Sequence, residues 1–132
     1  MRTVHVVLQA LVLAGAAIAQ TSQCPVTISE VRNIESRMYV SFENDNASAI
    51  TSYQFGFMFV DLKGKQHQFP VPMGKKENVA PGKKWIAMFP SADSLSYLFP
   101  QANAYLSKVT FADGTTWNDD GTHACSVTSW QE

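Results

Sequence analysis

Four aromatic residues fall at every second position of one short stretch: Tyr53, Phe55, Phe57 and Phe59. A β-strand places residues i, i+2, i+4 and i+6 on one face, whereas a helix would scatter the four rings around its circumference. Four rings on one face carry too much apolar surface to be left in water. The pattern therefore predicts a central core strand over residues 50–61, with these rings pointing into the core.

The opposite face of this predicted strand carries Gln54, Gly56, Met58 and Val60. A glycine inside a strand contributes no side chain to packing, and it often marks a bulge or the close approach of another backbone segment. We therefore expect a bulge or a close backbone approach at Gly56.

Further strands are predicted from alternation and from turn signals. Residues 104–111 alternate so that Tyr105, Ser107, Val109 and Phe111 would share one face. Pro81-Gly82 predicts a type II turn and Asp113-Gly114 predicts a hairpin turn. The other predicted strands cover residues 26–29, 38–43, 67–69, 84–89 and 115–117.

About seven short strands separated by frequent turns predict an all-β fold, a β-sandwich, with a small closed barrel as the alternative. Pro70 and Pro72 cannot donate ladder hydrogen bonds, so this segment should lie at a sheet edge or leave the sheet. Leu95, Leu98 and Phe99 have helical spacing, which predicts one short helix near residues 91–99.

The N-terminus has the three parts of a secretory signal peptide. Arg2 precedes an apolar run over residues 6–18, and Ala17 and Ala19 supply the small residues that signal peptidase requires. A run of this length is too short to span a membrane as a helix. We expect residues 1–19 to be cleaved, leaving residues 20–132 as a single β-sandwich domain that is secreted or periplasmic.

The two cysteines, Cys24 and Cys125, lie near the two ends of the predicted mature chain. Export to an oxidising compartment makes a disulfide between them the expected state, and two buried free thiols are the alternative.

Charge is distributed unevenly along the chain, although the net formal charge is only −1. Between residues 62 and 84 only Glu77 opposes six lysines, whereas the later acidic residues face Lys108 alone. A basic face of this kind could bind an acidic protein, a polysaccharide or an anionic lipid surface. Alternatively, the lysines could protect a sheet edge from aggregation. The near-neutral total argues against nucleic acid. The six lysines are Lys63, Lys65, Lys75, Lys76, Lys83 and Lys84.

The chain has few residues whose pattern points to catalysis or metal binding. A hydrolytic site could be assembled in space, for instance from His123 with Asp119 or Asp120, although turn residues near a chain end are usually solvated. The aspartates around Asn118 lack the spacing of an EF-hand loop, and methionines at strand positions are usually core residues. The sequence therefore predicts no metal site and no cofactor.

At two places the residues resemble a known family. Phe59-Val60-Asp61 with Gly64, followed by Ala80-Pro81-Gly82 before a strand, resembles small immunoglobulin-like domains of exported bacterial proteins, including FxLYD-type domains. The stretch over residues 109–117 is similar to a tail found in secreted bacterial proteins. The FxLYD name expects Leu-Tyr-Asp where this chain has Phe-Val-Asp. The resemblance spans roughly residues 24–125 and implies an immunoglobulin-like sandwich without a defined activity.

The function expected from the sequence is that of an exported, non-enzymatic binding or accessory domain. The alternative is a small secreted hydrolase that uses His123.

Overall fold

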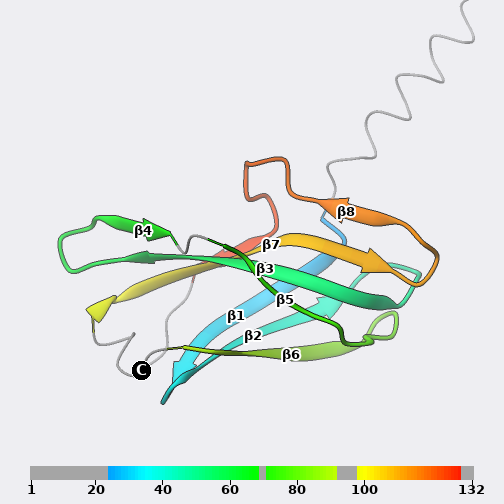
Figure 1. Ribbon diagram of the computed structural model, residues 1–132, viewed down its shortest axis with the longest axis horizontal. Helices are drawn as coiled ribbons and strands as arrows, with labels where there is room; N and C mark the ends of the chain where they lie inside the picture. The colour runs from blue at the N-terminus through cyan, green and yellow to red at the C-terminus, as the bar shows by residue number, and fades with distance from the viewer. Residues whose placement is uncertain (1–23, 69–70, 92–97, 129–132) are drawn as a thin grey trace, which may run out of the picture.

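The computed structural model describes residues 24–68, 71–91 and 98–128, which form two antiparallel β-sheets packed as a sandwich (Figure 1). The predicted all-β fold and the β-sandwich are confirmed, and two packed antiparallel sheets are consistent with the immunoglobulin-like class. Residues 1–19, where the signal peptide is predicted, lie outside the described residues, as does most of the helix predicted near 91–99.

The small sheet contains three strands in the order β1-β2-β6. They are β1 (Val26–Ile34), β2 (Arg37–Asn44) and β6 (Lys84–Pro90). In β2 the residues Met38, Val40 and Phe42 are buried and alternate with partly exposed residues, as predicted. One face of this sheet therefore packs on the core.

The large sheet is built on two long strands, β3 (Ile50–Val60) and β7 (Gln101–Phe111), which pair along their length. On the free side of β3 lie β4 (Gln66–Gln68) and β5 (Met73–Lys75), and on the free side of β7 lie β8 (Thr116–Asn118) and β9 (Ser126–Thr128). The described residues thus form nine strands rather than about seven. The two unpredicted strands, β5 and β9, are each three residues long.

The core lies between the two sheets and is dominated by aromatic rings. Tyr53 and Phe59 are each 2% exposed, and Phe55 and Phe57 are fully buried, so the predicted inward face of β3 is confirmed. These rings meet rings of the small sheet edge to face: the centroids of Phe57 and Phe89 are 5.6 Å apart at an interplanar angle of 71°. Such pairs stabilise by ~0.5–1.5 kcal/mol beyond the apolar area that they bury.

The predicted single face for Tyr105, Ser107, Val109 and Phe111 is wrong. Gln54 pairs with Lys108 while the next residue, Phe55, pairs with Leu106, so Ser107 is an extra residue on β7 at a β-bulge. The bulge reverses the alternation, because one additional residue exchanges the two faces of the strand. Leu106 therefore faces the core, and Tyr105 lies on the outer side opposite Gly56.

Both predicted glycine turns are present. Lys83 N donates to Ala80 O at 3.1 Å with Gly82 at φ 75°, as a type II turn requires. After β7, Phe111 N donates to Thr115 O at 2.9 Å, and Gly114 adopts φ 89° in the hairpin loop leading to β8.

Candidate functional site

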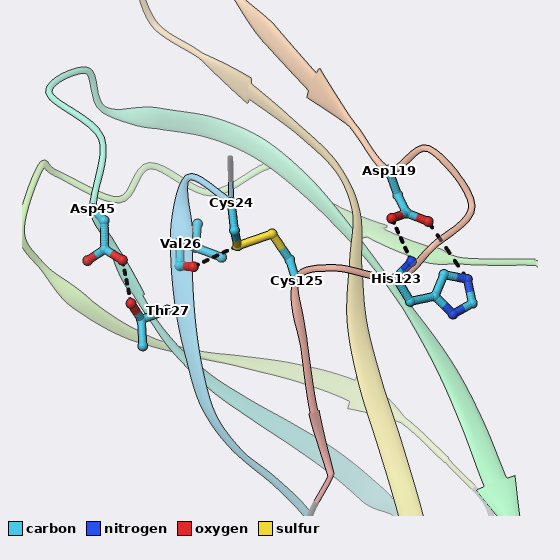
Figure 2. Close-up of a disulfide and its surroundings, with 7 residues drawn as sticks. All are labelled: Cys24, Val26, Thr27, Asp45, Asp119, His123 and Cys125. Carbon is cyan, nitrogen blue, oxygen red and sulfur yellow. Dashed lines mark hydrogen bonds and ion pairs between the residues drawn. A yellow bond between two sulfur atoms is a disulfide. The ribbon is translucent and has the colours of Figure 1, made fainter. Parts of the chain in front are cut away.

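The disulfide between Cys24 and Cys125 is formed, as predicted, and it joins the start of β1 to the segment leading into β9 (Figure 2). The two Cα atoms are 5.5 Å apart across a sequence separation of 101 residues. Cys125 is 2% exposed, and Leu106 N donates to its carbonyl oxygen at 2.8 Å. The bond therefore ties the small sheet to the large sheet at one end of the sandwich.

His123 lies two residues before this disulfide, and its ring packs against the large sheet. The ring stacks on Tyr105 with centroids 3.6 Å apart and an interplanar angle of 10°. Its backbone N–H donates to Asp119 Oδ1 at 3.0 Å, and Nε2 lies 3.7 Å from Asp119 Oδ2 (Figure 2). These contacts give the ring a packing role on the outer face of β7.

The aspartates near the C-terminus are engaged in turns. Asp113 accepts hydrogen bonds from the backbone and hydroxyl of Thr115, and Asp120 accepts the equivalent pair from Thr122. These bonds stabilise the charged carboxylates, so the pKa values of Asp113 and Asp120 are lowered from the ordinary value. Among the residues that the structure describes, no group of three or more His, Cys, Asp or Glu side chains is arranged to hold a metal ion.

The six lysines of the predicted basic face are divided among several places. Lys63 and Lys65 are exposed on the turn between β3 and β4. Lys75 Nζ is 5.8 Å from the Phe89 ring centroid and Lys83 Nζ is 5.3 Å from that of Trp85, at the seam between the sheets. Lys76 lines a hollow on the large sheet, whereas Lys84 lines a different hollow on the small sheet.

Glu77, the only acidic residue of the basic segment, is a hydrogen-bond acceptor at this seam. The Tyr53 hydroxyl and Trp85 Nε1 both donate to Glu77 Oε1, the latter at 3.1 Å. The hydrogen bond from Tyr53 and then that from Trp85, together with the nearby charge of Lys75, lower the pKa of Glu77. Burial and the neighbouring carboxylate raise the pKa of Tyr53 well above its ordinary value. The Glu77 charge is therefore held on the core-facing side of β3.

A hollow of about 260 Å³ lies on the opposite, outer side of β3. Register places Gln54 between Gly74 and Lys108, and Ser52 beside Thr110. Lys76, which directly follows the last residue of β5, also lines the hollow. The sequence could not show that Lys76 and Lys108 line the same hollow. Lys108 belongs to the acidic C-terminal part of the chain, and it lies near Lys76 only because β3 pairs with both β5 and β7. We call this hollow the basic groove; it is lined by Ser52, Tyr53, Gln54, Gly74, Lys75, Lys76, Lys108 and Thr110.

Two other hollows each have an acidic residue in their lining. A hollow of about 700 Å³ on the small sheet brings Glu43 beside Lys83 and Lys84 over the exposed Ile86. A third, of about 460 Å³, lies beside the disulfide and includes Asp45, Asn46 and Trp117. Among these three hollows, the basic groove alone combines lysines with no acidic lining residue. Across the described ranges, no helix is long and apolar enough to cross a membrane.

Fold and site together define a disulfide-bonded antiparallel β-sandwich. No protein-family model and no curated protein matches this chain. A hypothetical protein from Peptoclostridium difficile 630 is similar in structure, with a TM-score of 0.52 and 14% identity over 75% of this chain and 88% of that chain. At this identity the likeness concerns the fold alone.

Two archaeal structures have lower TM-scores. The archaellum periplasmic stator complex of FlaF and FlaG from Sulfolobus acidocaldarius matches at a TM-score of 0.46 and 15% identity, over 84% of this chain and 93% of that chain. The stator protein FlaG from the same organism matches at a TM-score of 0.44 and 12% identity, over 79% and 97% of the two chains.

Proposed function

We propose that this chain is an exported, non-enzymatic binding or accessory domain that recognises an anionic partner outside the cytoplasm. The Cys24–Cys125 disulfide supports the proposal that the chain is exported, since structural disulfides persist in oxidising compartments. The basic groove, with lysines from two strands and no acidic lining residue, carries the binding part. The FxLYD-type family and the single domain over residues 20–132 are retained as predictions.

The alternative of a hydrolase using His123 is less well supported. The His123 ring is stacked on Tyr105, and the backbone N–H of His123 donates a hydrogen bond to Asp119. His123 and Asp119 therefore both hold the loop before Cys125 in place. A general base needs its imidazole to face a substrate.

Export is tested by expressing residues 1–132 in a bacterium and analysing the periplasm and medium. We expect a mature protein that begins at Gln20 and carries an oxidised Cys24–Cys125 pair. Retention of Met1 or of free thiols in exported protein would contradict the export part.

Binding is tested with three probes at low ionic strength: polygalacturonate, vesicles containing phosphatidylglycerol, and an acidic protein. At least one should bind the mature protein and be released by salt, because exposed charge interactions are screened. Failure of all three would overturn the proposal.

A further inference from the structure

We infer that the basic groove binds the carboxylate groups of an extended anionic polysaccharide. This inference rests on the proposed function and makes it specific, because it names the groove residues and the class of partner.

The strand register makes the groove a continuous polar surface. Ser52 and Gln54 alternate with the buried Tyr53 and Phe55, so their side chains lie on the outer face of β3. Thr110 lies beside Ser52, and Lys108 lies beside Gln54 on β7. Hydroxyl and amide groups therefore separate Lys76 from Lys108 across the groove, whereas the third lining lysine, Lys75, directs its Nζ to the Phe89 ring.

The charges of the groove have the geometry for a polymer with spaced anionic groups. Lys76 follows β5 and Lys108 belongs to β7, with β3 between them, so their backbones are about 10 Å apart across the sheet. Among the described residues, the ion pairs shorter than 4.0 Å involve histidines and no lysine. Glu77 is occupied by Tyr53 and Trp85 on the core-facing side. The positive charges of Lys76 and Lys108 therefore remain available to an external carboxylate.

The lining favours a polysaccharide over a lipid surface. Ser52, Gln54 and Thr110 offer the hydrogen-bonding groups that sugar hydroxyls require, and the groove is open. Membrane-surface sites place apolar side chains beside their basic residues. Tyr53 is the one aromatic residue of the lining and is only 2% exposed, so the groove presents polar and lysine side chains. The exposed Ile86 and Met88 lie on the other sheet, and the exposed Leu62 and Val71 are not part of the lining.

The experiment compares two double variants that remove the same charge from different places. K76A/K108A alters the groove, and K63A/K65A alters the exposed turn between β3 and β4. Affinity for polygalacturonate should fall about five- to ten-fold in K76A/K108A at low salt and less than about two-fold in K63A/K65A. Ser52→Ala keeps both charges and should weaken polygalacturonate binding about three-fold through loss of a hydroxyl. Thermal melts of all variants confirm that the fold is retained.

The outcomes separate this inference from the proposed function. Equal losses in the two double variants would show that net charge alone governs binding and would overturn the groove assignment. Binding of vesicles or of the acidic protein without polygalacturonate would overturn the polysaccharide assignment and leave the proposed function standing. Failure of every anionic probe would overturn both.

Discussion

Gly56 leaves the space that the ring of Tyr105 occupies. A Cβ atom built at Gly56 would lie 2.2 Å from Tyr105 Cζ, far inside van der Waals contact. Tyr105 in turn stacks on His123, and its hydroxyl accepts a hydrogen bond from Gln68 Nε2 at 2.9 Å. One missing side chain on β3 thus allows β7, β4 and the loop before the disulfide to meet on the outer face of the large sheet.

Gly56→Ala should lower the free energy of unfolding by ~1–3 kcal/mol, the usual cost of overpacking. The methyl group would displace the Tyr105 ring and with it the His123 stack. Denaturant melts measure the change. In a Tyr105→Ala background the same substitution should cost much less, and an equal cost in both backgrounds would show that the ring is not the cause.

Phe57→Ala should destabilise the protein by ~3–5 kcal/mol, because the ring is fully buried against Phe89. Gln54→Ala, on the outer face of the same strand, should cost far less. Chemical denaturation of the two variants provides the comparison, and a Phe57→Ala protein that melts like the wild type would mean that the rings are not the core in solution.

Replacing both cysteines by serine should destabilise the protein by ~4–5 kcal/mol in the chain-entropy model, because the bond closes a loop of about 100 residues. Intact mass before and after reduction should differ by about 2 Da, the two hydrogens gained by one disulfide. An unchanged mass on reduction would mean that the bond is absent from the purified protein.

His123→Ala should reduce stability by ~0.5–1.5 kcal/mol through loss of the stacked ring. His123→Phe keeps an aromatic ring at the same left-handed backbone position, φ 55°, and should lose less. Calorimetric melts of the two variants measure these losses of stability. A hydrolytic activity present in the wild type and absent from both variants would instead support the enzymatic alternative.

Stability should depend on pH through Glu77. Its folded-state pKa is lowered from 4.5, so the stabilisation is complete above pH 4.5 and is lost as pH falls through the lower folded pKa. Glu77→Gln should be less stable than the wild type at neutral pH, and the difference should shrink below pH 4.5. Urea melts across this range measure it, and a constant difference would contradict the assignment.

The faces of β2 and β3 were predictable from the sequence, because period two and turn chemistry are local properties. The aromatic face of β3, the alternation of β2 and the turns at Gly82 and Gly114 were all confirmed. The Cys24–Cys125 pairing was predictable for a different reason, since the chain has only two cysteines.

The tertiary structure alone decided which strands far apart in the chain lie side by side. The bulge at Ser107 moved Tyr105 to the face of Gly56, although the sequence alternates without a visible break. The pairing of β3 with β7 brought Lys108 to the groove of Lys76, and the packing of the two sheets placed Glu77 between Tyr53 and Trp85. These contacts join residues far apart in the chain, and their partners are selected by packing and hydrogen bonding across the whole sandwich, which no local pattern of residues encodes.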